Sequence, residues 1–597
     1  MSRSTASGGI RTWGVITASM GLLTAGAAVV GTAPAAVSAA AAGDCAAAFP
    51  VDELVTGDDV NGLTVTSGTA PTAFTGKVLG VIDDGIAVDL DMVMVEVDAP
   101  DFIKSVGIWQ GMSGSPVYAA DGRLIGAVAY GLSWGPSPIA GVTPFEEMDD
   151  YLATAPAEPV AVDRSTARTI ARETDVTVEQ AEEGFTQLRM PMGVSGLSST
   201  RLAKAAGVDK PYAPKGAYSM GRSSAEAAGP ETIVAGGNLA ASVSYGDITM
   251  AGVGTATSVC DDEVVGFGHP MTFMGKTTMS LHPADALFIQ PESLGAPFKV
   301  ANLGAPAGVI SEDRLAGITG SFGEAPDAAD ITSVVDYDGR SRTGTTHVTV
   351  PDYTANAVFG QFLSNHDRVL DGIIKGTSLQ EWTITGVRPN GAEFSLSWAD
   401  RYTSSYDITW SSIFDLADLV WSLSSIPGVS VTSVSVDSDV TDETGVWKVA
   451  SVEQRRAGAW TKLTRKTPAV VKGGKTLRLR TILTGPEGTK IIPTSFAVPR
   501  RARKARSVVL SIAGGGSLYN DSWVQSVYEA EKSLASAVRN DEIKVEFGTP
   551  DAITGGGYYG EDEFDFGRER FSFAKSRLVG PLDQVVEGAK FLTVRVR

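Results

Sequence analysis

The chain has 597 residues, of which 43% are hydrophobic and 20% charged, and it contains 67 glycines. Its length predicts several domains, and its composition is that of a globular protein rather than a disordered one. The 69 acidic and 49 basic residues give a formal net charge of −20. Because an acidic surface repels phosphate, this charge argues against a nucleic-acid partner.

The first 42 residues have the order of a secretory signal peptide. Two arginines near the start precede an apolar stretch over 13–30, and small residues follow over 35–42. We expect cleavage between Ala39 and Gly43, with an uncleaved anchor helix as the alternative. The protein is therefore expected outside the cytoplasm, either secreted or held in the cell envelope.

No later stretch predicts a membrane span. The most apolar one, 411–426, contains Asp415 and Asp418. Each carboxylate would cost about 3 kcal/mol near the centre of a bilayer. We therefore expect this stretch to form a helix on a domain surface.

Short strand and turn patterns predict a mainly β protein. Strand signals predominate in two regions that we interpret as the halves of one catalytic unit, and an insert with helices at 165–188 and 200–206 separates them. The later chain is typical of one or two β-sandwich modules with a helix at 411–426, followed by a mixed α and β segment. After the signal peptide, the predicted regions are 43–155 for the first half, 156–230 for the insert, 231–325 for the second half, 326–510 for the β modules and 511–597 for the last segment.

The strongest chemical signal is the segment Gly111-Met112-Ser113-Gly114-Ser115-Pro116. Gly111 and Gly114 allow a sharp backbone bend, because they carry no Cβ. Such a bend can present the Ser113 hydroxyl and direct the amide hydrogens of Gly111 and Ser113 to one point. Two donors arranged in this way form an oxyanion hole, which predicts Ser113 as a nucleophile.

The residues after this turn, 116–131, resemble the nucleophile hairpin of trypsin-like peptidases. In that group the second strand hydrogen-bonds the substrate backbone, and the matching stretch here is Ala129-Tyr130-Gly131. Met112 stands where those enzymes usually have the aspartate that binds a newly released N-terminus. Its presence argues against that route of zymogen activation, but not against catalysis.

A serine nucleophile needs a base, because its hydroxyl is weakly nucleophilic at neutral pH. The chain offers four histidines, and only His269 lies in a glycine-flanked segment, Gly266-Phe267-Gly268-His269-Pro270. His282 follows closely, whereas His347 lies in a predicted strand and His366 in a predicted helix. We therefore expect His269 to be the base.

The serine and histidine segments together resemble the SpoIVB peptidase family, peptidase family S55, over roughly residues 50–325. The resemblance implies a trypsin-like double β-barrel that acts as an exported serine endopeptidase on a protein or peptide substrate. In the sporulation peptidase the histidine segment comes first, whereas here Ser113 precedes His269, as in members whose halves are exchanged. Catalytic triads are defined by geometry and not by chain order, so this order does not forbid catalysis.

The acid of the triad has four candidates. The sporulation peptidase has an aspartate fifteen residues before its serine, and the same spacing here selects Asp98. Asp101 lies three residues further on. Asp261 and Asp262 lie close to His269 in the sequence, on an expected hairpin turn. We favour Asp98.

Cys45 and Cys260 are the two cysteines. In an oxidising exterior they can pair, and we expect that they do. No motif for a metal ion or a nucleotide cofactor is present, so neither is expected.

Two further interpretations stay open. A peptidase scaffold without catalysis, serving as an envelope protein, would suit the long β-rich C-terminal half and Met112. Alternatively, the serine could act only on its own chain, with the insert over 156–230 as the cut site.

Overall fold

The structure is a computed structural model. The residues it describes are 45–98, 106–132, 136–150, 162–173, 176–188, 191–291, 296–505, 507–518, 523–553 and 571–597. The predicted signal peptide and its cleavage site lie outside these residues. Among the described helices, none combines the length and apolarity that crossing a membrane requires.

Six strands of the first half close into an antiparallel barrel, which is Barrel 1. Val93, Val95 and Val97 of one strand are buried, and because alternate residues share a face, they point into the barrel with valines from the other strands. The strands lie in the order β1 (Asp59–Thr64), β2 (Thr72–Ala87), β3 (Leu90–Asp98), β6 (Ile139–Pro144), β5 (Leu124–Leu132) and β4 (Pro116–Ala119), and β4 pairs with β1 to close the ring.

The insert contains helices, as predicted. The prediction of one helix over 165–188, however, is wrong at its C-terminal end. Thr177 and Gln180 form a capping box that begins the second of two helices, and Gly184 ends it with φ of +78°. Residues 185–188, expected to be helical, instead pair with Barrel 1, where Phe185 is buried. The elements here are α2 (Phe145–Asp150), α3 (Arg164–Glu173), α4 (Val178–Glu182), β7 (Phe185–Gln187), β8 (Gly193–Val194), α5 (Ser199–Ala206) and β9 (Tyr218–Ser219).

The second half forms another closed, six-stranded antiparallel barrel, Barrel 2, so the predicted mainly β double-barrel fold is confirmed. Between the fourth and the fifth barrel strand in chain order, the chain forms a hairpin of two further strands. The barrel order is β10 (Asn238–Gly246), β13 (Gly275–His282), β16 (Gly308–Arg314), β17 (Gly317–Phe322), β12 (Glu263–Gly266) and β11 (Met250–Cys260), and the hairpin is β14 (Ala284–Gln290) with β15 (Phe298–Leu303).

Cys45 and Cys260 form a disulfide bond. The predicted pairing is therefore present. The bond joins the segment before Barrel 1 to the last residue of β11 in Barrel 2.

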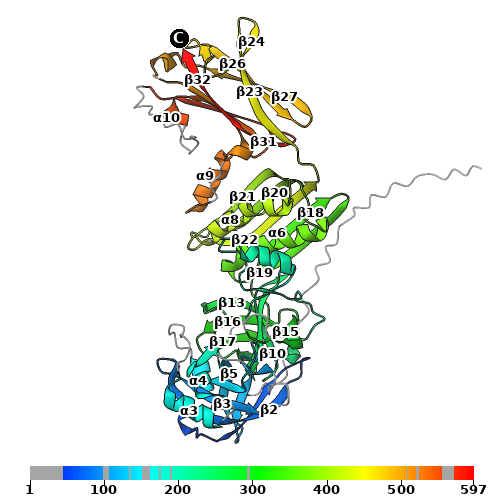
Figure 1. Ribbon diagram of the computed structural model, residues 1–597, viewed down its shortest axis with the longest axis vertical. Coiled ribbons are helices and arrows are strands. Elements are labelled where there is room, and N and C mark those ends of the chain that lie inside the picture. The colour runs from blue at the N-terminus through cyan, green and yellow to red at the C-terminus, as the bar shows by residue number, and fades with distance from the viewer. Residues whose placement is uncertain are drawn as a thin grey trace, which may run out of the picture. The chain divides into compact units, whose positions relative to one another are not determined.

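The region predicted as one or two β-sandwich modules, 326–510, differs from that expectation in its first part. There, helices cover one face of the sheet (Figure 1). This helix-covered sheet continues Barrel 2, since β10 also pairs with β19. It is a two-layer α/β unit and not a sandwich. Its elements are β18 (Ala329–Tyr337), β19 (Arg340–Val348), α6 (Thr354–Leu370), β20 (Gly376–Val387), β21 (Glu393–Ser404), α7 (Ile408–Ser412), α8 (Phe414–Ser424) and β22 (Ser430–Thr441).

The last module is a β-sandwich, in which two sheets share one hydrophobic core. The expected boundary at 510 falls inside one of its strands, so the module extends across it. One sheet contains β23 (Val446–Arg456), β24 (Ala459–Lys462), β26 (Thr476–Gly485), β27 (Gly488–Ala497) and β31 (Val585–Glu587). The other contains β25 (Ala469–Val471), β28 (Val509–Gly514), β29 (Ile543–Gly548), β30 (Ala574–Val579) and β32 (Ala589–Val596), with α9 (Val527–Ser536) and α10 (Pro550–Ile553) between strands.

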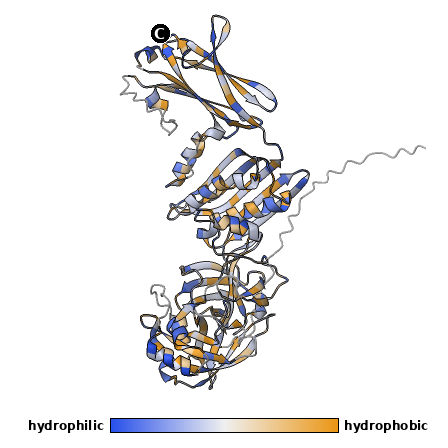
Figure 2. Ribbon diagram, viewed as in Figure 1, coloured by the Kyte–Doolittle hydropathy of each residue, from blue (hydrophilic) through white to orange (hydrophobic). Residues whose placement is uncertain are grey.

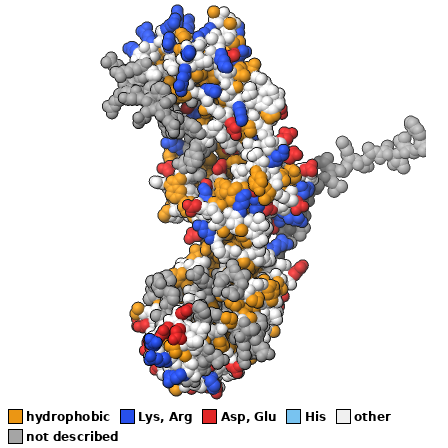
Figure 3. Space-filling view, in the orientation of Figure 1, with side chains coloured by type: hydrophobic (Ala, Val, Ile, Leu, Met, Phe, Trp, Pro, Cys, Tyr) orange, Lys and Arg blue, Asp and Glu red, His pale blue; other side chains and the backbone are white. Residues whose placement is uncertain are grey.

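Hydrophobic and hydrophilic residues alternate along many strands, as Figure 2 shows. In β22, for example, buried and exposed residues alternate over most of the strand. This alternation is the physical origin of the strand signals in the sequence. Figure 3 shows Lys and Arg side chains gathered over the β-sandwich at the top of the view.

Candidate active site

Ser113 lies in a tight turn before β4, and this turn needs its glycines. Gly111 has φ of +93° and Gly114 has φ of +94°, which L side chains rarely adopt. A Cβ on Gly114 would overlap the carbonyl oxygen of Thr255, and a Cβ on Gly111 would lie 2.9 Å from that of Val253. Both carbonyls belong to β11, so the glycines let the Ser113 turn approach the backbone of Barrel 2.

The amides of Gly111 and Ser113 are free to act as an oxyanion hole. The carbonyl on the other side of each peptide unit is held in place: Gln110 O accepts from Lys299 N (2.9 Å), and Met112 O accepts from Ser115 N (2.9 Å). Because C=O and N–H point in opposite directions across a trans peptide, both N–H groups point away from these contacts. Neither donates to another described residue. Both N–H groups thus have no hydrogen-bond partner among the described residues, and their role as oxyanion donors stays a prediction.

His269 meets Ser113 across the two barrels. It follows β12 through Phe267 and Gly268, which both have positive φ. Its Nε2 lies 2.8 Å from Ser113 Oγ, and both side chains are fully buried. A Cβ on Gly268 would lie 2.9 Å from Ala127 Cβ of β5, so this glycine allows the close approach. The structure thus brings the predicted nucleophile and base together.

The second ring nitrogen of His269 determines its protonation pattern. Nδ1 lies 2.8 Å from the carbonyl oxygen of Pro270. Since the Pro270 carbonyl oxygen only accepts hydrogen bonds, we place the proton on Nδ1 and the lone pair on Nε2, facing the Ser113 hydroxyl. Gln187 Nε2, which lies 3.0 Å from Nδ1, then has its acceptor in the Pro270 carbonyl, 3.3 Å away. This tautomer is the one that a general base requires.

None of the predicted acids contacts His269 in the described part of the chain. Asp98 ends β3 and is exposed, and its main-chain oxygen accepts from Thr75 Oγ1. Asp261 and Asp262 are exposed on the turn between β11 and β12, and Asp101 lies outside the described residues. The expected role of Asp98 is therefore not supported by its position, because the Pro270 carbonyl takes the place where a triad acid would bind.

Asp313 is the acidic residue that the sequence reasoning missed. It is buried in β16 and accepts hydrogen bonds from Met271 N (2.7 Å), Thr272 N (2.9 Å) and Thr272 Oγ1 (2.7 Å). It thereby holds the segment that follows His269. In the sequence Asp313 stands between Glu312 and Arg314, and no local signal distinguishes it from an exposed charge.

Burial dominates the electrostatics of the base. It lowers the pKa of His269 to about 4, while the Pro270 carbonyl, the charge of Asp313 and the Leu188 carbonyl act in the opposite direction. The imidazole is therefore neutral at pH 7, as a base must be before proton transfer.

The predicted substrate strand is occupied. Ala129, Tyr130 and Gly131 lie in β5 beside the site, but β7 of the insert pairs with this edge. Leu188 N donates to Ala129 O at 3.0 Å and continues the pairing. A peptide substrate would have to displace these residues.

Lys299 is a buried lysine next to the Ser113 turn, and no sequence signal identified it. Its Nζ lies 2.9 Å from Asn238 Oδ1, 3.3 Å from Thr255 Oγ1 and 3.4 Å from Gly254 O, which provide one acceptor for each of its three protons. Burial lowers its pKa to about 7. Because Thr255 Oγ1 also donates to Gly111 O (3.1 Å), this cluster supports the turn from below.

A second buried serine–histidine pair lies within Barrel 2. His282 Nε2 is 2.8 Å from Ser242 Oγ, and its Nδ1 is 3.0 Å from Gly304 O. Ser242, however, lies inside β10, which pairs with β11 and β13 on its two sides. Its backbone belongs to the sheet, so this pair has no oxyanion hole and is structural.

The other histidines also have structural settings, as expected. His347 Nδ1 lies 2.7 Å from Asp330 Oδ1 between neighbouring strands. His366 stacks on Phe362 within α6.

The described residues build no metal centre. The one group of potential ligands that they bring together is Cys45, Cys260 and Asp261, and its two cysteines are joined in the disulfide.

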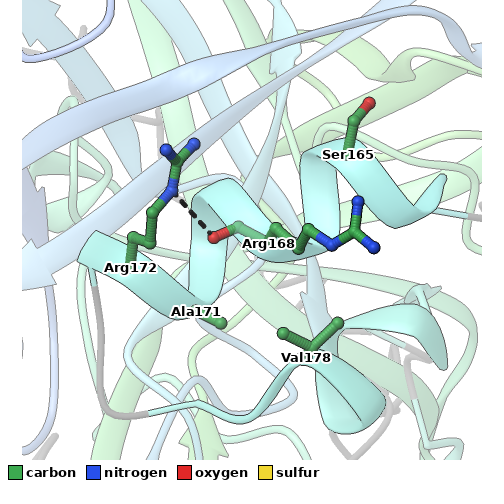
Figure 4. A pocket seen from close by; sticks show the side chains of 5 residues that line it. All are labelled: Ser165, Arg168, Ala171, Arg172 and Val178. Carbon is green, nitrogen blue, oxygen red and sulfur yellow. Dashed lines mark hydrogen bonds between the residues drawn. The ribbon is translucent and has the colours of Figure 1, made fainter.

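An open pocket lies between α3 and α4, but neither Ser113 nor His269 lines it (Figure 4). There Arg172 Nε donates to the Arg168 carbonyl. Among the described residues, Ser113 and His269 therefore remain the candidate site.

No family model matches the chain, and a match was found neither among curated proteins nor among solved structures.

Proposed function

We propose that the protein is an exported serine endopeptidase of the SpoIVB type, with Ser113 as nucleophile and His269 as base. One observation carries this proposal: the His269 lone pair faces Ser113 Oγ at 2.8 Å, beside two free backbone N–H groups. The resemblance of both segments to that family supports it. The signal-peptide pattern supports action outside the cytoplasm.

The geometry suggests each proton's path. Ser113 Oγ bonds to the substrate carbonyl carbon while its proton passes to His269 Nε2. The N–H groups of Gly111 and Ser113 stabilise the resulting oxyanion. His269 then protonates the leaving amine as the C–N bond breaks, and water hydrolyses the acyl-enzyme by the same path in reverse.

The charged imidazole is stabilised here in an unusual way for this chemistry. Its Nδ1–H donates to the Pro270 carbonyl, and Asp313 supplies negative charge through the segment that it holds. A neutral carbonyl stabilises a cation less than a carboxylate does. We therefore expect slower turnover than that of an enzyme with a direct carboxylate partner.

A fluorophosphonate probe tests the proposal, because it reacts with activated serines. It should label wild-type protein and fail to label Ser113→Ala. Ser242→Ala is the matched control, since it removes the hydroxyl of the structural pair, and it should be labelled like wild type. Equal labelling of wild type and Ser113→Ala would overturn the assignment.

The burial of both Ser113 and His269 favours one alternative, a binding protein on an inactive peptidase scaffold. In that case Ser113→Ala and His269→Ala would fold and retain full biological activity. Loss of activity in both folded variants would exclude it.

A further inference from the structure

Charge is distributed unevenly along this chain. Residues 1–445 contain 53 acidic and 23 basic residues, whereas residues 446–597, which form the β-sandwich module, contain 16 acidic and 26 basic residues. The module is therefore positive, although the whole chain has a formal net charge of −20. Figure 3 shows Lys and Arg side chains gathered over it. The net charge of the whole chain does not describe this module, which can attract anions.

The positive charge is densest at one end of the sandwich. There the turn 472–475 packs against the 3-10 helix Arg500–Lys504, since a Cβ on Gly474 would lie 3.0 Å from Arg500 Cγ. Ala502 is buried in the core of the sandwich and anchors the helix. The six exposed cations of these two segments, which we call the basic end, are Lys472, Lys475, Arg500, Arg501, Arg503 and Lys504.

The basic end has no counter-charge among the described residues. Between residues 454 and 520 the sequence contains 15 basic residues and a single acidic one, Glu487. Arg480 of β26 pairs with Glu453, but none of the six cations of the basic end forms an ion pair or a side-chain hydrogen bond with another described residue. Like charges held this close repel one another, and an anionic partner would relieve the repulsion.

The composition of the basic end indicates the chemistry of its partner. Neither 472–475 nor 500–504 contains an aromatic residue, and their one apolar side chain, that of Ala502, is buried. Proteins that lie on a bilayer commonly insert apolar side chains into it, and proteins that bind single-stranded nucleic acid stack aromatic side chains on the bases. The basic end offers neither feature, so it suits a polyanion without bases or lipid chains.

The spacing of the cations favours phosphate groups over the carboxylates of a peptide. Four of the five residues in Arg500–Lys504 are cationic, and at about 2 Å of rise per residue they lie along roughly 10 Å. Along an extended peptide, side chains on one side recur only about every 7 Å, so an acidic peptide presents few charges over this length. A linear phosphate polymer carries charge in every backbone unit, and Arg and Lys both bind phosphate oxygens.

We propose that the basic end binds a linear, phosphate-bearing polymer of the cell envelope. The polymer would hold the sandwich module, while residues 1–445, with their excess of acidic residues, would be repelled from it and stay accessible. The expected export of the chain places this polymer outside the cytoplasm. The binding uses neither Ser113 nor His269, so it is independent of the proposed peptidase activity.

Titration of the whole chain with long-chain inorganic polyphosphate, followed by calorimetry, tests the proposal. Binding should be measurable at about 50 mM salt and should weaken by about 100-fold at about 200 mM, because neutralising several charges releases counterions from the polyanion. An absence of binding at the lower salt concentration, or an affinity that does not change with salt, would overturn the proposal.

Two pairs of lysines test the location of the site. Lys472→Gln combined with Lys475→Gln removes two charges from the basic end, so affinity should fall by roughly 10-fold or more and the salt dependence should become weaker. The matched control is Lys448→Gln combined with Lys590→Gln, at exposed lysines near the starts of β23 and β32. It removes the same charge from the module and should bind like wild type. Equal losses in the two double variants would contradict the assignment to the basic end.

The choice of phosphate is tested by the arginines and by competing ligands. Arg500→Lys, Arg501→Lys and Arg503→Lys together keep the charge but remove the planar forks, so affinity should fall by about 5-fold with an unchanged salt dependence. Poly-glutamate, single-stranded DNA and phosphatidylglycerol vesicles should each bind at least about 10-fold more weakly than polyphosphate at equal charge concentration. Tighter binding of any of these three would overturn the assignment of a phosphate polymer without bases or lipid chains.

Fluorophosphonate labelling of the same samples separates this proposal from the peptidase proposal. Labelling of Ser113 in protein that does not bind polyphosphate would refute the polymer site alone. Salt-dependent binding by protein that is not labelled would support the polymer site and refute the peptidase.

Discussion

Two buried serine–histidine pairs in this molecule have nearly the same hydrogen bonds. Ser113–His269 and Ser242–His282 both have Oγ to Nε2 distances of 2.8 Å, and in both histidines Nδ1 faces a backbone carbonyl. Burial lowers the pKa of each histidine to about 4. A serine–histidine hydrogen bond therefore does not identify a nucleophile.

The two pairs differ in the backbone around the serine. Ser113 lies in a turn with two free N–H groups next to a sheet edge that binds an extended segment. Ser242 lies inside a strand whose backbone groups belong to the sheet. Only the first setting can stabilise an oxyanion and align a peptide, which is why we assign chemistry to Ser113 alone.

The largest expected effect is the contrast between the two serines. Ser113→Ala should lower peptidase activity by roughly 10,000-fold or more, because nucleophile and base act as a unit. Ser242→Ala should change activity only slightly and lower stability by about 1–3 kcal/mol, since it leaves His282 without its partner. Peptide hydrolysis and chemical denaturation measure the two outcomes. Equal activity losses would contradict the distinction.

The next effect concerns the backbone of the turn. Gly114→Ala forces a Cβ into the Thr255 carbonyl at φ of +94°, so we expect a loss of about 3 kcal/mol in stability and of most activity. Gly122, with φ of +88° and open space around it, is the control. Gly122→Ala should cost only about 1 kcal/mol and leave activity intact. Thermal unfolding with an activity assay compares the two variants. Similar losses in both would contradict the claim that Gly114 is needed for the close approach of the turn to the Thr255 carbonyl.

A smaller difference in peptidase activity is expected between substitutions of Asp313 and Asp98. Asp313→Asn should lower kcat/KM by about 10-fold, and the acid limb of its pH profile should move to lower pH. The sign follows because the Asp313 charge raises the pKa of His269, so its removal lowers that pKa. Asp98→Asn should leave rate and profile unchanged. A large loss in Asp98→Asn would restore Asp98 as the triad acid.

The smallest effect is a slope in the pH dependence of stability. Burial lowers the pKa of His282 from 6.5 to about 4, so its neutral form contributes stability that is complete above about pH 6.5 and is lost as the pH falls towards 4. Each such histidine contributes up to about 1.4 kcal/mol per pH unit in that window. His282→Gln should reduce the slope of unfolding free energy against pH by about one proton. An unchanged slope would show that His282 does not titrate as proposed.

Part of the site could be predicted from the sequence, because it depends on local backbone conformation. The glycines around Ser113 and His269 require positive φ at Gly111, Gly114 and Gly268, and such positions leave a clear signal. Alternating hydrophobic residues likewise predicted the strands of both barrels. The pairing of Cys45 with Cys260 was predicted because they are the two cysteines of the sequence and an oxidising exterior would allow them to pair.

The hydrogen-bond partners of His269 and the strand that pairs with residues 185–188 could not be predicted in this way. The sequence spacing selected Asp98, yet the histidine binds the Pro270 carbonyl, and Asp313 acts from a different strand. Helical periodicity extended to Leu188, but the open edge of β5 converts the end of that stretch into strand β7. Edge pairing satisfies backbone groups that a helix end would leave free, so tertiary contacts overrode local preference there.

The sequence by itself determined the Ser113 turn, because its glycines take backbone conformations that other residues rarely adopt. It also determined the two β-rich halves around the insert, through their alternating patterns, and the disulfide, through its two cysteines. Only the tertiary structure decided which carbonyl orients His269, which carboxylate acts near it, and which segment occupies the substrate strand. Those choices depend on distances between residues far apart in the chain, and no local pattern records them.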